Sequence, residues 1–162
     1  MNSLLNPTHI HLMITHLSIF GSILGALVLI YGMITKSHHT RIAALLLFIL
    51  TSLSSFIADY TGDAASHTMK QVAGISKATI KEHHQAAQFG LLSLYILGAV
   101  SLISLVYISV KKPAKTTLLN WVVLIVALWS FSVTARTGYL GGKIRHTELD
   151  ATPADSTNII KQ

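Results

Sequence analysis

One apolar stretch decides the fold: residues 10–34 read IHLMITHLSIFGSILGALVLIYGMI. As a helix rising about 1.5 Å per residue, this stretch is long enough to cross a hydrocarbon core of about 30 Å. Three more apolar runs follow, and none of the four contains an internal proline. We therefore expect an all-α membrane protein, a four-transmembrane-helix up-down bundle with helices over about residues 9–35, 41–60, 79–110 and 117–137.

The composition also indicates a membrane protein. Of the 162 residues, 51% are hydrophobic and only 11% are charged, whereas ordinary soluble domains are about 25% charged. The absence of cysteine excludes disulfides, thiolate metal sites, iron–sulfur clusters and covalent c-type haem attachment. The net charge of +6 comes with no basic stripe, so nucleic-acid binding is not expected.

The connections between the runs suggest how the chain is organised. Short polar turns at residues 36–41 and 111–115 would join antiparallel neighbours, while the connection at residues 61–81 is longer and mixed in character. A polar tail occupies residues 151–162. We expect one domain, residues 1–150, with no internal repeat.

Both short turns are densely basic, which bears on orientation. The positive-inside rule places such turns in the cytoplasm. Both termini would then lie outside, on the periplasmic side of a bacterial inner membrane that the chain crosses as a multi-pass protein.

The histidines are distributed unevenly. Of the nine, His38 and His39 flank a basic turn at one end of the predicted bundle. The others gather at the opposite end, together with all six carboxylates. These histidines are His9, His11, His16, His67, His83, His84 and His146. Because ligand-type side chains beside lipid are costly to place, this end predicts a binding or redox site.

Imidazoles without thiolates bind Zn, Cu, Fe or haem iron. A b-type haem needs two histidines from different helices at similar depth. His16, inside the first apolar helix, and His84 or His83, at the start of the third, meet that condition.

Further residues at the same end extend this hypothesis. His11 with His146 would hold a second haem or a metal ion, and Arg136 and Arg145 would pair with haem propionates. One or two haems are therefore expected.

A bare Fe, Cu or Zn ion is the alternative cofactor. Its ligands would be Glu82, His83, His84, His16 and Asp59, since carboxylates and histidines together on helices favour a non-haem site. A third reading, of another class, is an accessory structural subunit of a respiratory complex whose histidines are incidental.

Two segments carry a family resemblance. Residues 11–17, HLMITHL, resemble the His-x4-His opening of a family of small four-helix bacterial membrane proteins of unassigned function. Residues 137–146, TGYLGGKIRH, are similar to that family's closing Gly-x-Leu-Gly-Gly segment with its Arg/His pair. The Thr61-Gly62 pair and a histidine opening the third helix also match, whereas Ser18 stands where the family usually has proline.

Members of that family are found joined to c-type haem or Rieske-type iron–sulfur domains, which implies membrane electron transfer. The resemblance carries over His11, His16, His146 and one of His83 and His84. We expect a membrane b-type cytochrome with bis-His ligation near the periplasmic face, more an electron-transfer protein than a stand-alone enzyme. Its electrons would pass between a periplasmic carrier, such as a c-type cytochrome or Rieske-type protein, and quinone or a partner membrane protein. An oligomer is compatible with the sequence.

Overall fold

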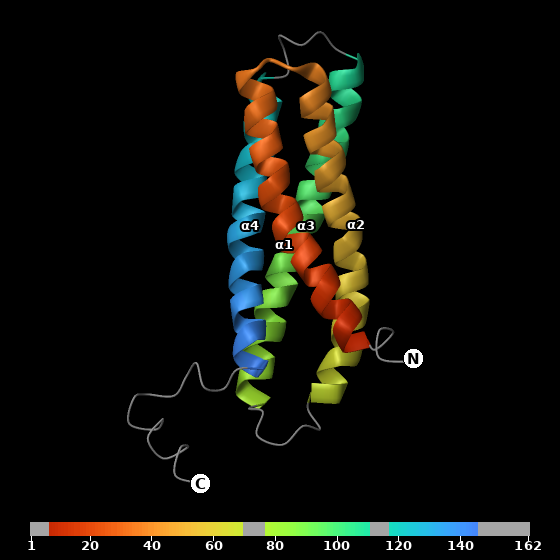
Figure 1. Ribbon diagram of the computed structural model, residues 1–162, viewed down its shortest axis with the longest axis vertical. Coiled ribbons are helices and arrows are strands. Elements are labelled where there is room, and N and C mark those ends of the chain that lie inside the picture. The colour runs from red at the N-terminus through yellow and green to blue at the C-terminus, as the bar shows by residue number, and fades with distance from the viewer. Residues whose placement is uncertain (1–6, 70–76, 111–116, 146–162) are drawn as a thin grey trace, which may run out of the picture.

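The computed structural model describes residues 7–69, 77–110 and 117–145. These residues form four long helices, which run alternately up and down as a bundle (Figure 1). Each helix is long and apolar enough to cross a membrane, which confirms the expected multi-pass architecture. The helices are α1 (Pro7–Ile34), α2 (His38–Met69), α3 (Lys77–Val110) and α4 (Thr117–Arg145).

Local sequence accounts for the first helical hairpin. Pro7 opens α1, where its missing N–H costs no helical hydrogen bond. Lys36, with φ of 54°, takes the left-handed conformation that ends a helix. The Ser37 hydroxyl then accepts a hydrogen bond from the Thr40 amide at 3.3 Å and so caps the start of α2. These features make the reversal tight enough for α1 and α2 to pack side by side.

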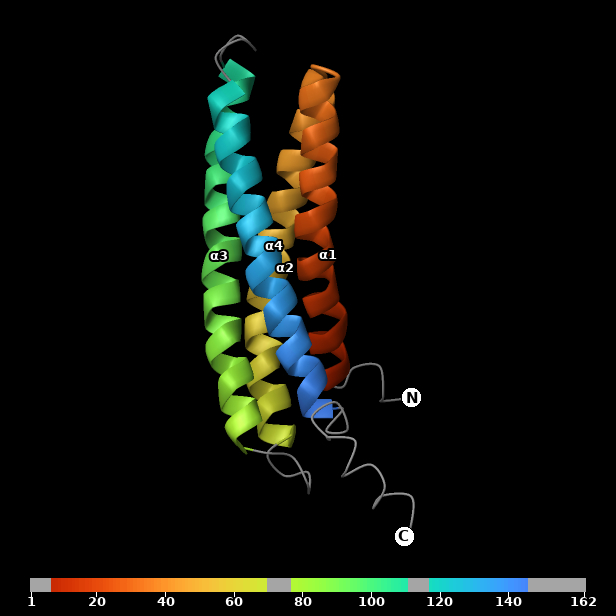
Figure 2. The same cartoon turned by 90° about the vertical axis from the view of Figure 1, so that its left-hand side faces the viewer.

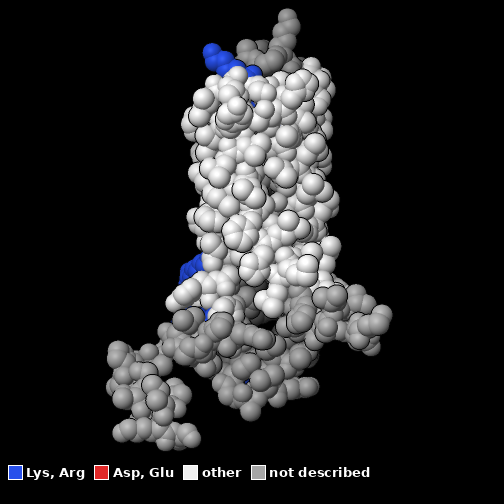
Figure 3. All heavy atoms as spheres, viewed as in Figure 1, with Lys and Arg blue, Asp and Glu red and all other residues white. Residues whose placement is uncertain are grey.

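The bundle has an apolar exterior and a partly polar interior. Large hydrophobic side chains such as Phe20, Leu50 and Ile125 are more than half exposed, and Figure 3 shows a face without charge between the two ends. Inside, Ser55 and Ser93 are fully buried and donate to carbonyls of their own helices at 2.6 and 2.7 Å. This distribution suits a chain surrounded by lipid, where polar groups must find partners inside the protein.

Small residues let the helices approach closely. The main packing partners of α1 and of α3 are the same two helices, α2 and α4, so α1 and α3 stand diagonally opposite. Figure 2 shows α1 and α3 on opposite sides of the bundle. Gly98 of α3 touches Ser52 of α2, since a Cβ there would lie 2.5 Å from the Ser52 Cβ. Such contacts provide the van der Waals packing on which helix association in membranes depends.

Two helices extend further than the sequence predicted. α2 continues to Met69 rather than residue 60, and α4 continues to Arg145 rather than residue 137. The glycine-rich stretch at residues 138–142 does not interrupt α4, which runs through it. Gly138 allows a close helix contact there, since a Cβ on it would lie 2.8 Å from the Ile19 side chain. The predicted polar tail lies outside the described residues.

The Gly98 contact yields a stability prediction. Gly98→Ala should lower the free energy of unfolding by about 1–3 kcal/mol, since α2 and α3 must separate to admit the methyl group. Gly142→Ala makes the same chemical change where nothing lies within 4 Å, so it should be neutral or slightly stabilising. Titration with SDS from a mild detergent, followed by circular dichroism, measures both. Equal stability of the two variants would contradict the packing described here.

Candidate functional site

His11 of α1 packs against α2 near the chain's N-terminal end. Its Nδ1 lies 2.9 Å from the carbonyl oxygen of Ala58 and 3.4 Å from the Thr61 hydroxyl. The ring lies against Gly62, where a Cβ would come within 2.9 Å of the imidazole Cε1. Glycine at position 62 is therefore what allows the imidazole to rest on the α2 backbone.

His83 of α3 packs against α4 in the same way. Its Nδ1 lies 3.1 Å from the carbonyl oxygen of Thr137, and a Cβ on Gly141 would come within 3.1 Å of its Cε1. The Thr137 hydroxyl donates back to the Ala86 carbonyl of α3 at 3.0 Å. The two helices are thus bonded in both directions around the imidazole.

The two histidine environments share one register. In each, the carbonyl acceptor stands one helical turn before the glycine under the ring. Ala58 and Thr137 are as far apart in the sequence as Gly62 and Gly141. The separation of Thr51 and Ser130 along the chain is the same again. For the other two helices, His11 and His83 are as far apart in the sequence as Gly21 and Ser93.

Those further positions are in contact too. Gly21 touches Thr51 between α1 and α2, and the Ser130 hydroxyl donates to the Ser93 carbonyl at 3.0 Å between α4 and α3. The hairpins α1–α2 and α3–α4 are therefore built to the same plan, although no repeat is apparent in the sequence.

This plan fixes the chemistry of both imidazoles. A carbonyl oxygen only accepts hydrogen bonds, so Nδ1 must carry the proton of each neutral ring. The lone pair is then left on Nε2, for which the described residues supply no hydrogen-bond partner in either histidine. An imidazole held through Nδ1–H by a backbone carbonyl has the usual arrangement of a metal ligand.

The other leading histidines face outward. His16 is exposed, its Nδ1 bonds the Leu12 carbonyl of its own helix at 2.6 Å, and its ring stacks with Phe20. His84 is exposed and lies 3.4 Å from the Gln88 amide nitrogen. Of the predicted candidates, His11 and His83 are therefore the pair that the bundle positions from two helices.

The remaining candidates are more dispersed. Asp59, Glu82 and Arg136 are exposed. His146 lies outside the described residues, as do the side chains of Arg145, His9 and His67. Within the described part of the chain, no group of three or more His, Asp or Glu side chains could hold a metal ion. The five-residue bare-metal set predicted from the sequence is accordingly not assembled.

Sequence reasoning missed the partners of the two histidines. The carbonyls of Ala58 and Thr137 and the glycines at 62 and 141 define the site as much as the imidazoles do. The repeated spacing from acceptor to glycine was the signal that could have found them.

The comparisons with known proteins returned no match: no family model, no curated protein and no solved structure is similar to this chain. The family resemblance noted in the sequence thus stays a prediction.

The hydrogen bonds predict a tautomer for each histidine. The measurement is NMR of protein labelled with ¹⁵N-histidine, at a pH high enough for the rings to be neutral. The His11 and His83 rings should then carry their proton on Nδ1, whereas free histidine in water prefers the Nε2–H form. His39, exposed and without a carbonyl bond among the described residues, serves as the control. Single-histidine substitutions assign the resonances. Nε2–H tautomers at both His11 and His83 would contradict the geometry.

Proposed function

We propose that this chain is a membrane b-type cytochrome in which His11 and His83 are the axial ligands of one haem. The observation that carries the proposal is the duplicated setting of the two rings. Each Nδ1 is held by a carbonyl of the neighbouring helix, at 2.9 and 3.1 Å, and each ring lies on a glycine. Two diagonal helices thus offer one neutral imidazole each.

The donor set fits haem better than a bare ion. A haem iron takes four ligands from the macrocycle and needs only two from the protein, whereas a bare ion needs three or more. The described residues bring together no larger group of His, Asp or Glu. Two imidazoles without a carboxylate between them are a typical b-type ligand pair.

The chain's own residues have distinct roles in this proposal. Bound haem would supply a one-electron iron couple. The Ala58 and Thr137 carbonyls keep each Nε2 unprotonated and orient the rings, and the Gly62 and Gly141 positions admit the rings close to the backbone. Arg136, exposed next to Thr137 on α4, would pair with a propionate.

The membrane setting supports a cellular role in electron transfer. We infer that the protein passes electrons between a periplasmic carrier, of the c-type cytochrome or Rieske kind, and quinone or a membrane partner. In this proposal the histidine end faces the periplasm and the basic turns face the cytoplasm.

Ligand removal tests the haem proposal. His11→Ala and His83→Ala should each reduce haem content at equal protein at least about tenfold, since even altering a partner of a ligand typically costs 10–100-fold in affinity. His16→Ala and His38→Ala are matched controls that should keep wild-type content. Purified wild-type protein should show a Soret band with sharp reduced α and β bands.

Other spectra would redirect the assignment. A colourless protein with stoichiometric iron, copper or zinc would favour the bare-metal alternative, and a colourless, metal-free one an accessory subunit. Full haem in both His11→Ala and His83→Ala would contradict the ligand pair.

Orientation is tested separately, and the absence of native cysteine makes the experiment clean. Asp63 and His39 are exposed at opposite ends of α2. A membrane-impermeant maleimide should label Asp63→Cys when only the outer membrane is permeabilised, and should reach His39→Cys only after lysis. The reverse pattern would overturn the orientation and leave the haem proposal standing.

A further inference from the structure

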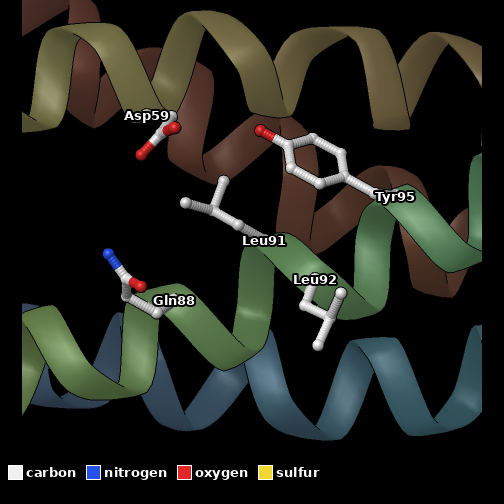
Figure 4. A pocket seen from close by; sticks show the side chains of 5 residues that line it. All are labelled: Asp59, Gln88, Leu91, Leu92 and Tyr95. Atoms are coloured by element: carbon white, nitrogen blue, oxygen red, sulfur yellow. The ribbon is translucent and has the colours of Figure 1, made fainter.

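A groove opens between α2 and α3. It has a volume of about 190 Å³ and is lined by Asp59, Gln88, Leu91, Leu92 and Tyr95. Figure 4 shows the Tyr95 hydroxyl pointing toward the Asp59 carboxylate, with the Gln88 amide on the same side. Three hydrogen-bonding groups therefore line an otherwise apolar groove.

Two residues of the groove are linked through their sequence neighbours to the proposed haem ligands. Asp59 directly follows Ala58, whose carbonyl holds His11. On the other wall, the Gln88 amide nitrogen lies 3.4 Å from His84, the residue after His83. A molecule in this groove would contact α3, which carries His83, and α2, whose Ala58 carbonyl holds His11.

Tyr95 is held in place by ring stacking. The Tyr95 ring stacks on Phe56 with 4.5 Å between centroids, and this stacking directs its hydroxyl toward the Asp59 carboxylate (Figure 4). Asp59 itself is exposed on the side of an apolar helix. An ionisable group at such a place is costly and therefore indicates a function.

We propose that this groove binds the head group of a lipid-soluble quinol. A quinol is a neutral aromatic diol, so the Asp59 carboxylate accepts one hydroxyl proton in a hydrogen bond while Gln88 and Tyr95 donate to ring oxygens. The volume is below the 300–1,000 Å³ typical of drug-sized ligands and suits a single ring. The isoprenoid tail then lies in the bilayer along exposed apolar side chains such as Leu92 and Phe89.

Charge separates this ligand from a phospholipid. None of the lining residues is a Lys or Arg, and the Asp59 carboxylate repels a phosphate. The same carboxylate favours quinol over quinone, because a quinone ring has only acceptors to offer. The role of the quinol as an electron donor rests on the proposed function, whereas quinol binding in the groove needs no haem.

Anaerobic equilibrium binding of decylubiquinol to the protein in neutral-lipid nanodiscs tests the proposal, with empty nanodiscs as the reference for partitioning. Binding should saturate at one quinol per chain and exceed that of decylubiquinone. Asp59→Asn should weaken it about tenfold or more and Tyr95→Phe about three- to tenfold, as expected for loss of a charged and a neutral hydrogen bond. Asp59→Asn should also reduce the preference for quinol.

Asp63→Asn and Tyr139→Phe are the matched controls, because both residues are exposed outside the groove. Binding no greater than in empty nanodiscs, or groove variants that behave like these controls, would overturn the proposal. So would a co-purifying phospholipid that Asp59→Asn releases and decylubiquinol cannot displace. Saturable quinol binding by a colourless protein would refute the haem proposal and support the quinol site. A haem-loaded protein that does not bind quinol would support the haem proposal and refute the quinol site.

Discussion

Inside a bilayer there is no water to bond with, so a polar group must find its hydrogen-bond partner within the protein. This constraint governs how the helices of the bundle pack. It directs buried hydroxyls such as those of Ser55 and Ser130 to helix carbonyls, whereas the buried Ser101 hydroxyl has no partner among the described residues. It also determines how the two histidines are held. His11 and His83 each give their Nδ1 proton to a carbonyl of the adjoining helix, and that satisfied bond leaves the second nitrogen available.

The same constraint explains the glycines. A ring can reach a neighbouring backbone carbonyl only if nothing projects from the helix at that point, and Gly62 and Gly141 provide the space. Because the α1–α2 and α3–α4 hairpins solve this problem identically, the histidine end has an approximate twofold character. A ligand with two similar faces, such as a haem iron with two axial positions, suits that arrangement. The groove at Asp59 and Tyr95 lies between α2 and α3, and Asp59 directly follows the residue whose carbonyl holds His11.

Much of this fold could be predicted from sequence because the apolar runs are long and free of proline. The helix ends could not: residues 61–69 and 138–145 are polar or glycine-rich and look like loops, yet they are helical. The sequence identified the candidate histidines, but choosing between His11 and His16 depended on which face of α1 turns inward. Ile14, Ser18 and other small or apolar residues surround both His11 and His16. The packing of α1 on α2 buries the His11 side and leaves His16 exposed, and only contacts between distant segments, such as His11 with Ala58, decide this.

The central claim is that His11 and His83 together suffice to ligate one haem. It is tested most directly by a variant that keeps these two histidines and replaces the other seven with non-ligating residues, examined by electron paramagnetic resonance of the ferric protein and by haem stoichiometry. The account predicts one haem per chain with the low-spin signal of two axial imidazoles, unchanged from wild type. A high-spin signal, or loss of the haem from a variant that remains folded, would contradict it.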